Sequence, residues 1–334
     1  MSTLTSTPSP ATTTEAARRG PRLSGLNWLV WRQHRAAFWT LIAGTVLSVA
    51  WMVYQRGQMM DFLNGVPGWP HPKASSNWDM KLSHRPLLET ASALGFLPIL
   101  IGVFIGAPLI AGDLENGHAK LVTSQSVSRV RWLATKLGVT VLVVVVGTAA
   151  LSTVFTWWWA PVRTDANVLF WTDGSGFDNS GPVPVALTLF TMVGGVAIGM
   201  LLRRTLLSMV VTFGFAVAVQ IIWSYIRLDL GNVVTLTTNK GVEHDATLPN
   251  AAYEVDRWFT TASGKLYGWS TCVNAPTDKA HAACVQQKGI VGWSVEYIPY
   301  SQMSAMQWLG ASILLALTAA ITVFIFLWGR KRLV

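Results

Sequence analysis

The sequence DLENGHAKLVTSQSVSRVRWLATK, residues 113–136, joins two long apolar runs and decides how the chain is organised. The run before it, residues 91–112, and the run after it, residues 137–159, each exceed 20 residues without an Asp, Glu, Lys or Arg. A helix rises roughly 1.5 Å per residue, so each run is long enough to cross about 30 Å of hydrocarbon. Residues 113–136 are therefore predicted to form a polar loop between two membrane spans.

Four further runs contain no Asp, Glu, Lys or Arg and reach spanning length: residues 36–54, 183–202, 205–226 and 304–328. The chain is 51% hydrophobic and 12% charged, with a mean hydropathy of +0.40, which leaves too little polar surface for a soluble protein. The first run exceeds the apolar core of a secretory signal, and no small-residue cleavage site follows it. The sequence predicts an all-α integral membrane protein with six transmembrane helices, the first of them retained.

The basic residues indicate the orientation of these spans, because Lys and Arg beside spans stay on the cytoplasmic side. With both termini cytoplasmic, the inner segments hold 14 basic and 3 acidic residues, and the outer segments hold 11 basic and 13 acidic residues. The net charges of +11 inside and −2 outside account for the overall +9. We interpret the basic balance as topology and contact with anionic membrane lipids, not as nucleic-acid binding.

The segments outside the spans divide the chain into recognisable parts. Residues 1–21 are predicted to be a disordered cytoplasmic tail. Residues 22–35 suit an interfacial helix, or alternatively an inward extension of the first span. Residues 36–226 hold spans one to five with the loop 113–136, residues 227–303 form an external module, and residues 304–334 form the sixth span with a basic cytoplasmic end. Within the module, residues 233–238, 265–273 and 290–298 favour strands.

Both cysteines of the chain, Cys272 and Cys284, lie in the predicted external module. An external location is oxidising, so we expect a disulfide between them in preference to two free thiols. A zinc site is disfavoured because His281 is the only other plausible ligand nearby. No metal or other cofactor is expected on this chain.

Several kinds of chemistry lack their usual motifs. The sequence has no G-x-x-x-x-G-K-[ST] phosphate loop, no G-x-S-x-G elbow and no H-E-x-x-H pair. The predicted spans also lack the ionisable side chains that ion-coupled carriers use. If this protein moves a substrate, the energy must therefore come from elsewhere. Gln220 is the most polar side chain within a span, and it is either a substrate-pathway residue or the donor of an interhelical hydrogen bond.

The proline and glycine residues within the spans predict where helices bend and where they approach one another. Pro98 and Pro108 are expected to kink the second span and to free carbonyl groups for neighbouring helices. The pairs Gly102-x-x-x-Gly106 and Gly195-x-x-x-Gly199 allow close helix contacts. These contacts lie either within one chain, which we favour, or in a dimer seam.

The loop carries a pattern that extends beyond its charge. Glu115 with Gly117, then residues 127–129 (VSR), then residues 136–137 (KL) give E-x-G…VSR…K-L. This pattern resembles the loop between the second and third spans in permeases of ABC exporters of the second type, also called type V. The stretches GAPLIAGDLENG and SQSVSRVRW are similar to the actinobacterial branch of these bacterial proteins. The resemblance covers residues 22–334.

This resemblance implies a coupling helix that docks on a separate ATPase subunit, which binds ATP and Mg. The residues it assigns to coupling are Asp113, Glu115, Asn116, Gly117, His118, Lys120, Ser124, Gln125 and Arg129. It also implies a second permease subunit, either an identical copy or a homologue, in a bacterial plasma membrane. A simpler interpretation is that the loop only follows the positive-inside rule.

We therefore expect a non-enzymatic permease that moves an apolar or amphipathic substrate, such as a lipid, drug or natural product, outward. A membrane scaffold or sensor, whose external module binds a ligand without transport, is the alternative. An embedded enzyme ranks third, because acids and histidines are not grouped. A neighbouring reading frame for an ABC ATPase favours export over the scaffold.

The charge distribution makes the topology testable. Ser126→Cys and Ser175→Cys place one thiol in the predicted inner loop and one in the predicted outer loop. An impermeant maleimide added to intact cells should label only position 175, because position 126 lies behind the membrane. Labelling of position 126 without cell lysis would reverse or break the predicted topology.

Overall fold

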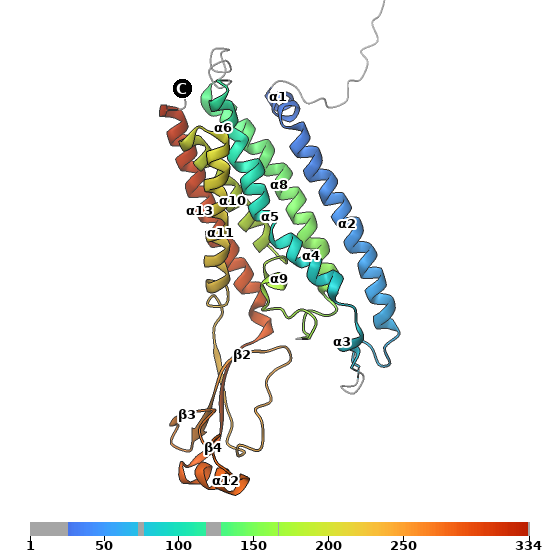
Figure 1. Ribbon diagram of the computed structural model, residues 1–334, viewed down its shortest axis with the longest axis vertical. Helices are drawn as coiled ribbons and strands as arrows, with labels where there is room; N and C mark the ends of the chain where they lie inside the picture. The colour runs from blue at the N-terminus through green and yellow to red at the C-terminus, as the bar shows by residue number, and fades with distance from the viewer. Residues whose placement is uncertain (1–25, 73–76, 118–127, 166, 333–334) are drawn as a thin grey trace, which may run out of the picture.

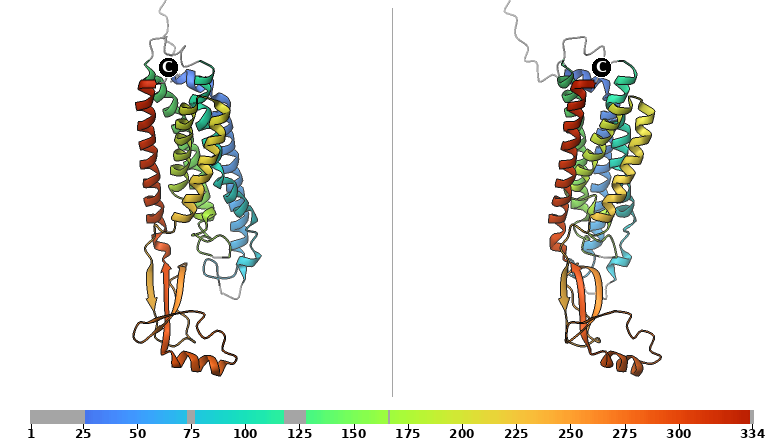
Figure 2. Two further views of the ribbon diagram at one scale, coloured as in Figure 1. Left: turned by 60° about the vertical axis from the view of Figure 1, so that its left-hand side comes forward. Right: turned by 90° about the vertical axis from the view of Figure 1, so that its left-hand side faces the viewer.

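The computed structural model describes residues 26–72, 77–117, 128–165 and 167–332, and within them six helical segments are long and apolar enough to cross a membrane. Four are single helices, α2 (Arg35–Asn64), α8 (Arg129–Trp159), α10 (Val183–Leu202) and α11 (Thr205–Ile226). The others are the composite run Arg85–Glu115 and α13 (Met303–Arg332). They run side by side along the long axis (Figures 1 and 2), so the protein is a multi-pass membrane protein.

The bundle has two different ends. One, called the loop end here, is where α6 (Ala107–Glu115) and α8 meet, and the C-terminus of α13 lies beside it (Figure 1). The helix α1 (Leu26–Gln33) also lies at the loop end, and His34, with φ −106° and ψ 16°, separates it from α2. It falls within the predicted interfacial segment 22–35, of which residues 22–25 lie outside the described residues. The opposite end is the module end, where α11 leads into the predicted external module.

The second span is built from four pieces, α4 (Arg85–Gly95), α5 (Leu97–Ile101), the π-helix η2 (Gly102–Gly106) and α6. The chain bends between α4 and α5 (Figure 1), just before Pro98. Helical geometry is disfavoured for a residue that directly precedes a proline. Near the bend, the carbonyl of Pro98 accepts a hydrogen bond from Thr191 Oγ1 at 2.8 Å, and that of Gly95 accepts one from Gln220 Nε2 at 2.8 Å. The predicted kink therefore brings carbonyl groups to neighbouring helices.

Glycines bring the second span and α10 into backbone contact. A Cβ atom on Gly106 would collide with the Met192 carbonyl, and one on Gly199 would collide with the Ala107 carbonyl. A Cβ on Gly195 would lie 2.7 Å from the Gly102 carbonyl oxygen. The two G-x-x-x-G pairs thus meet within one chain, as we favoured. These contacts make α10 the most central span. In its most apolar stretch of 18 residues 72% of the residues are buried, whereas in the corresponding stretch of α2 only 11% are.

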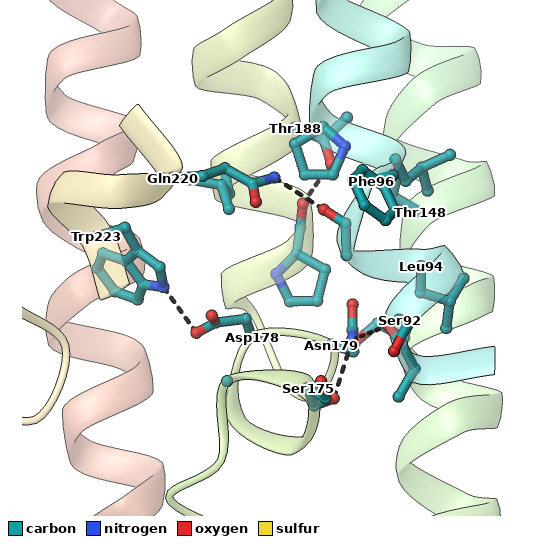
Figure 3. A pocket seen from close by; sticks show the side chains of 18 of the residues that line it. Ser92, Leu94, Phe96, Thr148, Ser175, Asp178, Asn179, Thr188, Gln220 and Trp223 are labelled. Atoms are coloured by element: carbon teal, nitrogen blue, oxygen red, sulfur yellow. Dashed lines mark hydrogen bonds between the residues drawn. The ribbon is translucent and has the colours of Figure 1, made fainter. Parts of the chain in front are cut away.

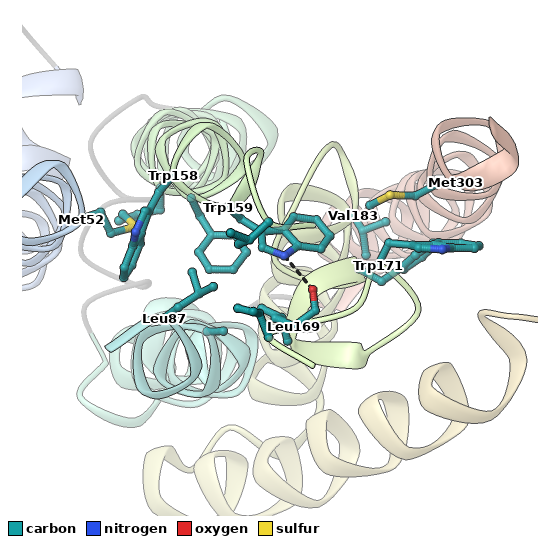
Figure 4. Packing of buried hydrophobic residues seen from close by; sticks show 14 of the residues in the cluster. Met52, Leu87, Trp158, Trp159, Leu169, Trp171, Val183 and Met303 are labelled. Carbon is teal, nitrogen blue, oxygen red and sulfur yellow. Dashed lines mark hydrogen bonds between the residues drawn. The ribbon is translucent and has the colours of Figure 1, made fainter. Parts of the chain in front are cut away.

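Aromatic side chains fix the segment 160–182 at the module end. Trp158, Trp159 and Trp171 are all at least 98% buried and pack with residues of α2, α4 and α13 (Figure 4). The indole nitrogen of Trp159 donates to the Leu169 carbonyl at 2.9 Å. This core holds the short helix α9 (Gly174–Phe177) and the residues that follow it against the spans.

The module is a four-stranded antiparallel sheet in the order β1-β4-β2-β3, with a helix, α12 (Asp278–Gln287), at its far end. Its strands are β1 (Val234–Thr237), β2 (Tyr253–Thr261), β3 (Leu266–Gly268) and β4 (Ile290–Ile298). The fold is therefore not purely α-helical. We had not expected β2, and the predicted strand 265–273 shrinks to β3. The predicted disulfide between Cys272 and Cys284 is confirmed, and it joins the segment after β3 to α12.

Two short elements, α3 (Trp78–Lys81) and η3 (Tyr300–Gln302), complete the described chain. The helix α3 lies between α2 and α4, and the 3-10 helix η3 leads from β4 into α13. Asn179 ties segment 160–182 to α4, because its Nδ2 atom donates to the Ala91 carbonyl at 2.7 Å. Two loops distant in sequence thus close the same end of the bundle.

The glycine contact can be tested by adding volume at one of its glycines and, as a control, at a glycine outside it. Gly199→Val should lower the melting temperature of the detergent-purified protein, since overpacking a close contact costs about 1–3 kcal/mol. Gly214→Val is the matched control, because a Cβ at Gly214 meets nothing within 4 Å and the helix propensity change is the same. Equal melting temperatures for both variants would contradict the proposed seam.

Candidate functional site

The predicted loop 113–136 is shorter in the structure than in our prediction. Helix α6 continues to Glu115, and α8 already begins at Arg129. Of the residues assigned to coupling, His118, Lys120, Ser124 and Gln125 lie outside the described residues. The other five frame the loop. The described helices therefore extend into the predicted loop from both sides, and Asn116 and Ser128 flank their ends.

Each visible part of the motif has a local structural role. Asn116 ends α6, with its Nδ2 atom donating to the Gly112 carbonyl at 2.8 Å, and Gly117 follows with φ +72°, which glycine tolerates best. Ser128 begins α8, because its Oγ atom accepts from the Arg131 backbone nitrogen at 3.2 Å. The E-x-G and VSR patterns thus set where the two helices stop and start. The Arg129 side chain is half-buried in the first turn of α8.

Asp113 and Lys136 correct our prediction most clearly. We expected both at the ends of a water-exposed loop, and the structure places them inside helices as a buried ion pair. The Lys136 side chain is fully buried, and its Nζ atom donates to Asp113 Oδ2 and, at 2.9 Å, to the Leu109 carbonyl. Gln33 Nε2 of α1 donates to Asp113 Oδ1 at 2.6 Å. The pair is tolerated because each charge is hydrogen-bonded, and it joins α1, α6 and α8.

Glu115 also has an intramolecular partner. Its Oε2 atom accepts from the Thr205 backbone nitrogen at 2.8 Å, at the first residue of α11. The first N–H groups of a helix have no partner within it, and a carboxylate there is favourable. Just before Thr205, the chain turns at Arg203, whose φ is +56°. Only two residues therefore join α10 to α11. Glu115 therefore links the second span to α11, whereas we had assigned it only to docking.

A cavity of about 300 Å³ lies nearer the module end, between the bend of the second span, α8, α9, α10 and α11 (Figure 3). Gln220, our weak pathway candidate, lines it and donates to the Gly95 carbonyl at 2.8 Å. Most lining side chains are apolar, hydroxyl or amide groups; the labelled ones include Ser92, Leu94, Phe96, Thr148, Ser175, Asn179, Thr188, Gln220 and Trp223. Gln220 therefore faces a cavity and also makes the interhelical bond that we named as the alternative.

Sequence reasoning missed the charged pair on this cavity. Asp178 Oδ1 accepts from Trp223 Nε1 at 2.7 Å, and its Oδ2 accepts from Arg227 Nη1 at 3.2 Å. Burial raises the pKa of Asp178 to about 6, and the charge of Arg227 and the Trp223 hydrogen bond oppose this rise. Asp178 lies in the predicted outer loop between the third and fourth spans, and the sequence analysis gave it no role. The only feature of the sequence that could have indicated its role is an acidic residue close to the start of the span at residues 183–202.

Comparison with known proteins agrees with the motif. A family model described as ABC-2 membrane transporter related matches residues 42–227, which is 186 of the 334 residues. The match runs from α2 to the end of α11 and stops where the module begins. No curated protein and no solved structure matches the chain.

The buried ion pair predicts a specific pattern of stability. Lys136→Met alone should leave the Asp113 charge buried without its cation, which costs about 3–5 kcal/mol in comparable pairs. The double variant Asp113→Leu/Lys136→Met should recover most of the lost melting temperature. Arg131→Met, at an exposed position on the same helix, is the control. A single Lys136→Met variant as stable as the parent would show that the pair does not hold the loop end together.

Proposed function

We propose an export function for this chain, which belongs to the ABC-2 membrane transporter related family because that family model covers more than half of it. Membership makes it a permease component of an ABC transporter, a class that works with a partner ATPase subunit. In our proposal the permease moves an apolar or amphipathic substrate, such as a lipid, drug or natural product, outward. Two copies, or one copy with a homologue, assemble with two ATPase subunits that bind ATP and Mg.

The cavity beside Gln220 carries the substrate part of the proposal. Its wall combines apolar side chains with neutral hydroxyl and amide groups, and its one acid, Asp178, is already paired with Arg227. A strongly charged cargo would lose its hydration there without gaining a free counter-charge. A molecule with an apolar body and a few hydrogen-bonding groups fits this wall, as ligands of mainly apolar pockets do.

The frame at the loop end supports coupling to the ATPase. Asp113 and Glu115 tie the second span to α1, α8 and α11 through hydrogen bonds and one ion pair. The second span and α11 also line the cavity. A displacement of the loop by a docked ATPase would therefore move both walls of the cavity. This route is a continuous chain of hydrogen-bonded and ion-paired elements, the kind of network that carries coupling energy between distant sites.

The proposed orientation places the loop end in the cytoplasm and the module end outside a bacterial plasma membrane. The basic residues of the inner segments favour this arrangement. The disulfide between Cys272 and Cys284 also supports it, since such bonds persist on the oxidising side. Both termini would then be cytoplasmic.

One observation favours the scaffold or sensor alternative. The ends of β2 and β4 pack against the core of the bundle, but most of the sheet extends beyond it (Figures 1 and 2) and the disulfide braces its far end, so it could present a binding surface. Such a protein would need no ATPase. Assembly with an ATPase and substrate-stimulated ATP hydrolysis therefore separate the two functions.

The decisive experiment is reconstitution with the ABC ATPase encoded in the neighbouring reading frame. The complex should form, and a panel of amphipathic dyes should stimulate its ATP hydrolysis. Gln220→Leu removes one neutral hydrogen-bonding group, worth about 1 kcal/mol, and should raise the half-maximal dye concentration roughly fivefold while basal hydrolysis stays within about twofold.

The control for this experiment is Gln287→Leu, at an exposed position of α12 in the module. It should leave stimulation unchanged. Failure of the ATPase to assemble would favour the scaffold. Assembly with an identical dye response in Gln220→Leu and the parent would remove this cavity from the substrate path.

A further inference from the structure

A second cavity, of about 520 Å³, lies at the module end between the last turns of α2, the connection from α3 to α4, and the last turns of α8. It shares no lining residue with the cavity beside Gln220. It is formed where the described helices leave the apolar part of the bundle. Nothing in the proposed export path uses it.

The polar side of this cavity consists of hydrogen-bond donors and one cation. Lys81, Gln58 and Ser83 line it, and none of the described residues that line it is an acid. Two nearby acids are engaged elsewhere, because Asp79 accepts from Asn167 and Glu89 accepts from Arg85. The cavity therefore favours an anionic ligand with acceptor oxygens.

Two polar atoms of lining residues have no partner within the described chain. Trp158 is 2% exposed, and no described atom accepts its indole N–H. The buried Nδ1 atom of His84 is likewise without a hydrogen-bond partner among described groups. A buried donor without an acceptor is costly, and a bilayer interior offers no water to satisfy it.

The other side of the cavity is apolar. Met59, Phe62 and Leu87 form it, and the cavity reaches Tyr54, which is 61% exposed. Exposed Tyr and Trp side chains at the end of a span lie at the level of lipid headgroups. A ligand here would hold its polar part against Lys81 and its apolar part along α2.

We propose that this cavity binds an anionic glycerophospholipid, with the phosphate against Lys81, Gln58 and Ser83 and the acyl chains beside α2. Such a lipid would fasten α2 to the rest of the bundle. This helix needs such support, since only 11% of the residues in its most apolar window are buried and its main helical neighbour is α8. The bound lipid is a structural partner, distinct from any transported substrate.

Lipid binding to the purified full chain tests the assignment directly. Short-chain phosphatidylglycerol, short-chain phosphatidylcholine and inorganic phosphate are titrated separately below micelle-forming concentrations, with binding followed by native mass spectrometry. Phosphatidylglycerol should bind at least fivefold more tightly than phosphatidylcholine. Lys81→Glu should weaken phosphatidylglycerol binding at least fivefold, and Lys279→Glu, at an exposed position of α12, should not.

The same measurements define the results that would overturn the proposal. Equal binding of the two lipids, or equal weakening by Lys81→Glu and Lys279→Glu, would exclude a specific anionic-lipid site here. Displacement of the lipid by inorganic phosphate alone would show a simple anion site and overturn the lipid assignment. Should Lys81→Glu prove unstable, a phosphatidylglycerol carrying a photoreactive acyl chain must crosslink to peptides 54–62 or 81–88 of the parent. Crosslinks confined to other spans would reject the site.

Discussion

The close backbone contact between the second span and α10 is the constraint on which the rest of the structure depends. Apolar helices gain little from hiding their side chains in a lipid bilayer, so association there relies on close packing of small residues. Gly102, Gly106, Gly195 and Gly199 supply that packing within one chain. The π-helix η2 lies in the contact itself, and such interruptions are frequent at functional sites. This glycine contact holds the bend of the second span, which opens one side of the cavity. It also sets the path of α6 to the loop end.

The second span and α11 are joined by hydrogen bonds at two widely separated levels. Gln220 holds the Gly95 carbonyl beside the cavity, and Glu115 holds the Thr205 nitrogen at the loop end. The Lys136 ion pair then connects the same span to α8 and α1. The cavity wall and the loop frame are consequently parts of one bonded unit. In the proposed complex, that unit would give a docked ATPase a mechanical path to the cavity that needs no unfolding of any span.

The sequence alone predicted the six spans, the kink at Pro98 and the disulfide, because each depends on local composition or on the chemistry of one residue or residue pair. It misjudged what depends on partners far away in the chain. Lys136 and Asp113 were assigned to water because charge signals exposure, and their mutual burial is visible only in three dimensions. Strand β2 was missed because three of the four residues 254–257 are charged. These charges obscured the β-forming residues beside them.

The misjudged and overlooked groups share one location, the ends of the spans. Asp178, Arg227 and Trp158 all lie within a few residues of a helix end, where exposure is decided by neighbouring loops and not by the apolar run itself. Inside a span, the apolar side chains exclude water. Well beyond the span, water can form hydrogen bonds with exposed polar groups. At the boundary, each polar group must find a protein or lipid partner or remain without one. The boundary is therefore where this chain places the Asp113–Lys136 and Asp178–Arg227 ion pairs and the cavity beside Lys81, and where structure adds most to what the sequence tells.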